Sequence, residues 1–402
     1  MTLSLPSDWK SVLVPAALDE EQPIIRPSAK IAARDYRPSG RFPIIDQSQN
    51  PIAGWTDSEA AVLRTPRPVI IFGDHSRTFK YADGPFAAGA DGTLILNPSK
   101  EFDPKFLYFA CLDLEIPSRG YNRHYTVLKE LSVPKPKPAE QRKIAAVLGK
   151  VQAAVEVEGE LIRVTRELKQ AALRQLFTRG LRCEPQKQTD LGPIPESWDV
   201  VPLGTLFETQ LGKMLSPKAK QGDTPLPYLR NKNVQWGRIE LDDVLTMDFD
   251  AREKAKFRLQ PGNLLICEGG IVGRCAIWRG QIEECYYQKA LHRVRPLSDE
   301  SSNEFLAYWF EHAFQFSNLY RLGGANSTIV HLPEVQLLRL QIPKPDPAEQ
   351  REIAKHLAAI DAKLAHHEAR RKLLRELFRT LLRDLMTARR RVTHLDLADL
   401  SL

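Results

Sequence analysis

Two long heptad patterns of apolar residues dominate the chain, and each predicts a long helix. Apolar residues spaced alternately by four and three positions form a stripe along a helix, which packs against the stripe of another helix. The clearer pattern lies toward the C-terminus, where a polar break at His367 separates two apolar runs. These runs are Ile353, Leu357, Ile360 and Leu364, followed by Leu374, Phe378, Leu381 and Leu385.

The earlier pattern has four apolar residues in frame and then places Glu158 in the same frame. The four residues are Ile144, Leu148, Val151 and Val155, and beyond Glu158 the frame blurs toward Leu161, Val164, Leu168, Ala172 and Leu176. If the two helices pack antiparallel about their midpoints, Glu158 lies opposite His367. We hypothesise that this pair forms a buried polar layer that sets the register of the helices. The alternative is that both side chains point to solvent.

The two helices begin with nearly the same sequence, which indicates an internal duplication. Residues 133–145 and 342–354 are identical at ten of thirteen positions, and the shift of 209 residues continues through both helices. In the second copy Asp346 suits the N-cap, Pro347 the first helical position and Glu349 the third. This order is a capping-box arrangement, which marks the start of a helix.

A longer segment of mixed pattern precedes each helix. Short apolar runs bounded by turn residues, such as 69–72 and 264–267, predict buried strands. Residues 102–114 and 302–320 predict helices rich in aromatic side chains. Between their entries and their helices the two segments share little sequence.

These patterns predict an α+β fold with a pseudo-two-fold internal duplication. Two mixed α/β domains are separated by two long antiparallel helices. The expected boundaries are 1–133 for the first domain, 134–181 for the first helix, 182–342 for the second domain and 343–402 for the second helix.

Composition and charge bound the class of protein only broadly. The 402 residues are 43% hydrophobic and 27% charged, as in an ordinary globular protein, and the net charge of +7 modestly favours a polyanionic partner. No apolar run approaches the length of a membrane span and no signal-peptide pattern is present, so we expect a cytoplasmic location. The five cysteines include no Cys-x-x-Cys pair; we interpret them as buried thiols and expect no metal site.

The chain contains no motif for a self-sufficient catalytic site. It has no Gly-x-x-x-x-Gly-Lys-[Ser/Thr] loop, no Gly-x-Ser-x-Gly elbow and no His-Glu-x-x-His sequence. The [Asn/Asp]-Pro-Pro-aromatic tetrapeptide of amino-group methyltransferases is also missing. We therefore expect no catalytic residues and no cofactor in this chain.

Polar loops near the ends of both domains instead carry side chains suited to DNA. Arginine can bridge two acceptors of guanine, Asn and Gln can bridge adenine, and Lys, Ser and Thr can bind phosphates. The candidate residues in the first domain are Asp74, His75, Arg77, Lys80, Arg119, Tyr121, Asn122 and Arg123. Those in the second are Lys213, Lys218, Arg230, Asn231, Asn233, Gln235, Asn326 and Ser327. For each residue alone, the alternative is a solvated loop position.

The whole arrangement resembles the specificity (S) subunit of type I restriction-modification enzymes. The resemblance extends over essentially the whole chain and is sharpest in 134–142 and 343–351, which lead into the helices. The tryptophans Trp9 and Trp198 at the domain entries and the Tyr228-x-Arg230-x-x-Asn233 sequence look like recurrent features of target-recognition domains.

The resemblance implies a function and a set of partners. In that family each α/β domain reads one half of a split DNA sequence, and the helices space the domains and bind two methyltransferase (M) subunits. Restriction (R) subunits complete the assembly. S-adenosylmethionine, ATP and Mg are then expected in the partner subunits. The residues expected at the helix pair and partner interface are Ile144, Leu148, Val151, Val155, Glu158, Ile353, Leu357, Ile360, Leu364 and His367.

The helices suggest how such a protein would measure DNA. Helices of about forty residues are about 60 Å long at ~1.5 Å per residue, so we expect them to set the gap of a bipartite target. Three alternatives remain open: the recognition subunit of a type IIB-like enzyme, an enzyme that acts on nucleic acid alone, and a coiled-coil scaffold with no role on DNA.

Overall fold

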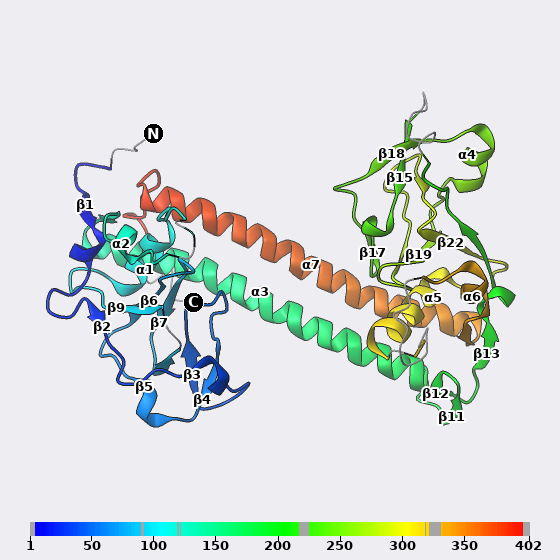
Figure 1. Cartoon of the computed structure of the whole chain (residues 1–402), viewed down its shortest axis with the longest axis horizontal. Coiled ribbons are helices and arrows are strands. Elements are labelled where there is room, and N and C mark those ends of the chain that lie inside the picture. Colours follow the sequence, from blue (N-terminus) through cyan, green and yellow to red (C-terminus); the bar gives the residue numbers. More distant parts are fainter. Residues whose placement is uncertain are drawn as a thin grey trace. The chain divides into compact units, whose positions relative to one another are not determined.

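The computed structural model divides the chain into two compact units (Figure 1). It describes residues 5–89, 92–118, 120, 122–216, 225–317, 319–320 and 331–396. Unit 1 comprises Met1–Glu160 and Glu368–Leu402, and unit 2 comprises Leu161–His367. Each unit combines one mixed α/β domain with part of each long helix, so the predicted α+β class and the duplication are confirmed.

Two long helices are the main elements of the chain, as predicted (Figure 1). Helix α3 (Pro138–Arg179) has 42 residues and helix α7 (Pro347–Met386) has 40. In unit 1 the beginning of α3 shares a core with the end of α7, and in unit 2 the end of α3 shares a core with the beginning of α7. The helix segments are therefore antiparallel within each unit.

The seam between the helices follows the predicted frame as far as Glu158. Ile144, Leu148, Ile353 and Leu357 are fully buried, and Val151, Val155, Ile360 and Leu364 are half-buried. Beyond Glu158 the seven-residue frame continues through Ile162, Thr165 and Lys169, all of which are buried. The expected continuation through Leu161, Val164 and Leu168 is wrong, because these side chains are 38%, 46% and 53% exposed on an outer face of α3.

The polar break in each helix is buried. Glu158 is 3% and His367 8% exposed, so the solvent-facing alternative is wrong. Within unit 1 Glu158 pairs with Arg370, whose Nε lies 3.1 Å from a carboxylate oxygen. Glu158 and His367 belong to different units, and their direct pairing stays a prediction.

Each long helix begins at a contact between a glutamate and the tryptophan that opens its domain. Trp9 Nε1 donates to Glu140 at 3.1 Å in unit 1, and Trp198 Nε1 donates to Glu349 at 3.1 Å in unit 2. All four residues are buried. The duplication therefore includes the packing of each domain entry onto its helix.

The predicted N-cap of α7 is confirmed, but the capping box is only half formed. Asp346 accepts a hydrogen bond from the Glu349 backbone N–H at 3.0 Å. The Glu349 carboxylate accepts from the Leu181 N–H at 3.0 Å as well as from Trp198. In unit 2 this carboxylate thus ties the start of α7 to the segment that follows α3.

Unit 1 contains two four-stranded sheets. The first is antiparallel, in the order β2 (Ile24–Ile25), β9 (Thr93–Leu96), β6 (Val69–Gly73), β7 (Phe79–Ala82). The second has the order β4 (Gly54–Thr56), β3 (Phe42–Ile45), β8 (Phe86–Ala88), β5 (Val62–Leu63), with β3 parallel to β8. The other strands and short α-helices are β1 (Lys10–Leu13), which pairs with β10 (Ser132–Lys135), α1 (Pro104–Leu112) and α2 (Tyr125–Leu128), and three 3-10 helices complete the described part of the domain.

Unit 2 repeats this strand order, except that its second sheet has three strands in the described residues and lacks a counterpart of β5. Its first sheet runs β14 (Phe207–Leu211), β22 (Leu291–Pro296), β19 (Leu264–Cys267), β20 (Cys275–Ile277). Its second runs β18 (Leu245–Asp248), β15 (Pro225–Leu229), β21 (Tyr286–Tyr287), with β15 parallel to β21 as β3 is to β8. The pair β13 (Asp199–Pro202) and β23 (Gln341–Lys344) corresponds to β1 and β10, and α5 (Asn303–Phe310) corresponds to α1.

Unit 2 also has elements without a counterpart among the described parts of unit 1. They are the hairpins β11 (Gln186–Thr189) with β12 (Gly192–Pro195) and β16 (Val234–Gln235) with β17 (Arg238–Ile239), α4 (Ala251–Phe257) and the π-helix Glu311–Phe316. Helix α6 (Glu334–Arg339), in contrast, corresponds to α2, because it starts 209 residues after α2 and directly precedes β23 as α2 precedes β10. Two domains that share little sequence therefore share a topology, and they differ mainly by insertions.

The predicted strands and aromatic helices form the cores. Strands β6 and β19 are buried along their whole length. Four of the five cysteines are buried as expected, but Cys183 is exposed. Over the described residues, no helix is long and apolar enough to cross a membrane.

Candidate nucleic-acid interface

The tight turn between β6 and β7 organises the polar loops of unit 1. The Asp74 backbone N–H donates to the Gly92 carbonyl at 2.7 Å, and the Arg77 N–H donates back to the Gly73 carbonyl at 2.7 Å. Arg77 adopts a φ of 61°, which is uncommon for a residue other than glycine. The backbone of the turn is therefore fixed, and it determines the positions from which the side chains of the turn project.

Asp74 brings the two predicted loops of unit 1 together. Its buried carboxylate accepts hydrogen bonds from the backbone N–H groups of His124 at 2.8 Å and Tyr125 at 2.7 Å. These N–H groups open helix α2, so Asp74 caps a helix fifty residues away in the chain. Arg77 makes a second link by donating to the Ile116 carbonyl at 3.0 Å.

Lys80 is buried rather than presented to a ligand. Its ammonium lies 3.5 Å from the Asp46 carboxylate, and only 9% of its side chain is exposed. Burial lowers the pKa of Lys80, and the nearby Asp46 charge opposes that effect. Asp74 and Lys80 therefore build the loops, and their direct contact with DNA stays a prediction.

Among the predicted DNA-contacting residues of unit 1, those whose side chains reach solvent lie on the same two loops. Arg77, Asn122 and Arg123 are exposed, and His75 is half-buried with its backbone N–H on Gln47. Arg123 is 80% exposed and lies 3.9 Å from Asp74. Arg119 and Tyr121 lie outside the described residues.

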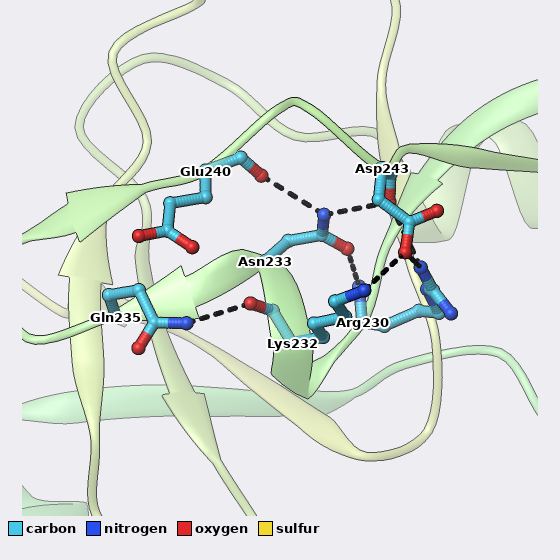
Figure 2. A network of polar contacts seen from close by, with 6 residues as sticks. All are labelled: Arg230, Lys232, Asn233, Gln235, Glu240 and Asp243. Atoms are coloured by element: carbon cyan, nitrogen blue, oxygen red, sulfur yellow. Dashed lines mark hydrogen bonds and ion pairs between the residues drawn. The ribbon is translucent and has the colours of Figure 1, made fainter. Parts of the chain in front are cut away.

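In unit 2 the predicted residues form an internal network (Figure 2). Asn233 is almost fully buried; it accepts from the Arg230 N–H at 2.9 Å and donates to the carbonyls of Glu240 and Asp243 at 3.0 and 3.1 Å. The Arg230 guanidinium lies 2.8 Å from the Asp243 carboxylate. These two side chains fold the loop around the 3-10 helix Asn231–Asn233.

Arg274, which the sequence analysis did not select, fixes the other face of this loop. It donates to the Asn231 carbonyl at 2.7 Å and to Gln235 Oε1 at 3.1 Å. The Asn231 side chain donates to the Gly269 carbonyl at 2.9 Å. The 230–235 loop is thus locked to the β19–β20 loop.

Lys213 is also engaged within unit 2. Its ammonium donates to the Asp248 carbonyl at 2.6 Å and to Glu253 at 2.5 Å, and it lies 4.9 Å from the centre of the Phe249 ring. Lys218, Asn326 and Ser327 lie outside the described residues.

Several loops of unit 2 that sequence reasoning missed meet next to this network. A β-bridge joins Gly269 to His331, and another joins Lys213 to Gln288. Exposed side chains here include Met214, Lys289 and His331, around a hollow of about 620 Å³. The glycine pair that follows β19 was the available signal, because glycines permit loops to approach closely.

In each unit, therefore, buried polar side chains hydrogen-bond to the loops at the strand ends and hold these loops in place. The arrangement offers exposed arginine, lysine and amide groups on a rigid base, which suits phosphate and base contacts. Among the described residues, no group of three or more His, Cys, Asp or Glu side chains could hold a metal ion.

Comparison with known proteins points to one family. Residues 195–376 match the family model described as the type I restriction modification DNA specificity domain. The putative type I restriction enzyme MjaX specificity subunit of Methanocaldococcus jannaschii is 26% identical over 74% of this chain and 71% of its own length. The StySPI specificity subunit of Salmonella potsdam is 25% identical over 44% of this chain and 39% of its own length.

Solved structures share the fold. The S subunit of a type I restriction-modification system from M. genitalium aligns with a TM-score of 0.65 at 18% identity, over 96% of this chain and 98% of that chain. A chain from a study of complex assembly and conformational transition of the type I system aligns with a TM-score of 0.53 at 17% identity, over 95% and 98%. The resemblance to type I specificity subunits is confirmed.

Proposed function

We propose that this chain, which resembles type I specificity subunits in sequence and in fold, is the DNA-recognition subunit of a type I restriction-modification complex. The supporting observation is the duplication itself. Two domains of one topology carry different loops at corresponding strand ends, and both are attached to the same pair of long helices. Two different recognition domains on one pair of helices suit a target with two different half-sites.

The target is a bipartite double-stranded DNA sequence, with one half read by each domain. An internally duplicated chain with pseudo-two-fold symmetry would present its two domains to DNA in opposed orientations, as a symmetric dimer does for identical half-sites. The continuous helices α3 and α7 support a fixed gap between the halves, because each is about 60 Å long at ~1.5 Å per residue.

The exposed apolar residues of the helices are the docking surface for two methyltransferase subunits. On α3 the residues Val157, Leu161, Val164 and Leu168 keep heptad spacing on an outer face. On α7 Leu373 and Leu377 are also exposed, and they are the duplicated counterparts of Val164 and Leu168. Apolar stripes at this spacing suit a partner helix.

Methylation and cleavage belong to the partner subunits in this proposal. S-adenosylmethionine would bind the methyltransferase subunits, and ATP and Mg would bind the methyltransferase and restriction subunits. This chain would contribute recognition, spacing and docking.

Coexpression with the methyltransferase subunit, followed by genome-wide mapping of methylated adenines, tests the proposal. We expect methylation at a split sequence with a constant gap, and none when this chain is left out. Insertion of one heptad into both α3 and α7 keeps the seam in frame and adds about 10 Å, so the gap should lengthen by roughly three base pairs. An unsplit target, or methylation by this chain alone, would contradict the proposal.

A further inference from the structure

A cavity of about 320 Å³ lies in unit 2 between α7 and the α/β domain. Its apolar wall consists of Ala354 and Ala358 from α7, Ala307 and Tyr308 from α5, and Ile277 from β20. The volume lies at the lower end of the range for ligand pockets. There is room for one large apolar side chain.

Two of the three acidic residues that line the cavity, Glu311 and Asp361, are neutralised from within, and the third, Glu304, accepts a hydrogen bond from the Ser302 hydroxyl at 3.2 Å. Lys169 Nζ lies 2.7 Å from Glu311 Oε1 and 2.8 Å from Asp361 Oδ1. The Tyr308 hydroxyl donates to the other Asp361 oxygen at 2.9 Å. The Glu311 and Asp361 carboxylates are therefore unavailable to an incoming cation.

Two of the basic groups at the cavity, unlike Glu311 and Asp361, are not neutralised by a partner. In the part of the chain that the structure describes, the guanidinium groups of Arg279 and Arg351 have no hydrogen bond or ion pair, and both residues are exposed. Lys355 pairs only with Glu352, a contact on the surface. The cavity therefore favours a ligand that carries carboxylates beside its apolar part, because guanidinium groups bind carboxylates with two parallel hydrogen bonds.

The corresponding place in unit 1 is filled by the chain itself. Gly149 is the duplicated counterpart of Ala358, and Lys105 follows the start of α1 as Glu304 follows the start of α5. The Lys105 ammonium lies only 3.2 Å from the position that a Cβ on Gly149 would occupy. Lys105 thus lies against α3, where unit 2 has open space.

We propose that the cavity of unit 2 receives an apolar side chain flanked by carboxylates from one methyltransferase subunit, and that unit 1 makes no such contact. This inference rests on the proposed function and deepens it. The two copies of the partner are then bound by unequal surfaces, and the copy at unit 2 loads first.

Titration of the full-length chain with its purified methyltransferase subunit, followed by native mass spectrometry, tests this inference. We expect the wild-type chain to bind two copies. Ala358→Trp fills the cavity from an exposed helix position and should weaken the binding of one copy about tenfold or more, leaving a one-to-one complex. Ala362→Trp, one turn further along α7 and outside the cavity lining, is the matched control and should bind two copies normally.

Charge reversal gives a second test with less steric change. Arg279→Glu and Arg351→Glu should each weaken the same copy and spare the other. The inference is overturned if Ala358→Trp binds like Ala362→Trp, or if the variants weaken both copies equally. A wild-type chain that binds no methyltransferase overturns the proposed function as well, so the two failures are distinguishable.

Discussion

The two units place different chemistry at the same position between their α/β domain and the long helices. In unit 1 Phe378 of α7 packs edge-on against Phe109 of α1, with ring centres 5.8 Å apart. In unit 2 the duplicated counterpart of Phe378 is Lys169 of α3, which lies 5.5 Å from the ring of Tyr308. An aromatic contact in one unit has become a charged contact in the other.

The exchange extends to neighbouring residues. Counted from the start of α1 and α5, Leu112 of unit 1 corresponds to Glu311 of unit 2, and by the helix repeat Gln152 corresponds to Asp361. Lys169, Glu311 and Asp361 form what we call the ion cluster. Burial disfavours the charge of Lys169, but the two carboxylates outweigh it and raise the pKa of that amine. Burial raises the pKa of Glu311 despite the lysine.

Each domain is therefore matched to its own end of the helices. A buried ion pair contributes little to stability compared with apolar side chains of similar size, but it strongly penalises a wrong partner. A domain of unit 1 type placed on Lys169 would bury that ammonium against Phe109 and Leu112. The ion cluster therefore opposes exchange of the two domains.

Lys169→Met gives the largest effect that we expect. It leaves the buried Glu311 beside the half-buried Asp361 without a cation, which should lower the free energy of unfolding by about 3 kcal/mol. Thermal or urea unfolding of the full chain, monitored through the tryptophans of unit 2, measures this loss.

The matched control gives unit 2 the side chains of unit 1. Lys169→Phe, Glu311→Leu and Asp361→Gln together should retain most of the wild-type stability, because no charge remains buried. If the triple variant loses as much stability as Lys169→Met, the equivalence of the two units at this position is contradicted. The ion cluster is then needed for packing rather than for matching the domain of unit 2 to its end of the helices.

The long-range organisation could be predicted from the sequence, because duplication and heptads are periodic. The starts of α3 and α7, the strands β6 and β19 and the α+β class followed from such patterns. The seam beyond Glu158 could not be predicted, because Leu161, Val164 and Leu168 look like seam residues and only their exposure shows otherwise. An apolar side chain does not reveal whether its own chain or a partner is meant to cover it.

The loop residues were predicted by type but not by role. Arg230 and Asn233 are suited to bases, yet Figure 2 shows them bound to their own loop. The same donors that recognise a base also satisfy a carbonyl, so sequence cannot separate the two uses. The contacts of Asp74 with His124 and of Arg77 with Ile116 were likewise hidden, because they join residues 50 and 39 positions apart.

Lowering the pH should change the stability of the two units differently, and we expect this effect to be of intermediate size. His312 in the π-helix of unit 2 stacks on Phe177 at 5.3 Å, and burial, helped by Arg174, lowers its pKa to about 4. The pKa of this histidine is higher in the unfolded chain, at about 6.5, so the unfolded chain binds a proton more readily than the fold does. The fold is therefore most stable above pH 6.5, where His312 is neutral, and it loses stability as the pH falls from about 6.5 to 4. The full loss is roughly 3 kcal/mol at 1.36 kcal/mol per pKa unit.

The position of His312 has an aspartate counterpart in unit 1, Asp113, whose pKa is raised by burial. A raised carboxyl pKa has the opposite sign: the stability it contributes is present at low pH and is lost as pH rises through the folded pKa. Unfolding midpoints measured from pH 4 to 8 should therefore fall in acid for the wild type and less so for His312→Asn. His356→Gln, at an exposed histidine, should follow the wild type; a His312→Asn profile that also follows it would contradict the assignment.

The smallest effects on stability, and the most informative for function, come from comparing an exposed arginine with a bound one. Arg123→Ala in unit 1 removes a side chain that is 80% exposed, so unfolding should change by less than about 0.5 kcal/mol. Arg230→Ala in unit 2 removes a half-buried guanidinium from Asp243, which keeps its pair with Lys232, and should destabilise the loop more than Arg123→Ala destabilises unit 1.

DNA binding by the assembled complex should reverse the order of these two variants. If Arg123 contacts a phosphate, its loss weakens binding at every target sequence and lowers the slope of log affinity against log salt by about 1. Arg230→Ala should leave that slope unchanged, because its guanidinium is occupied by Asp243. Fluorescence anisotropy over a salt series distinguishes the two, and equal slopes for Arg123→Ala and the wild type would remove Arg123 from the interface.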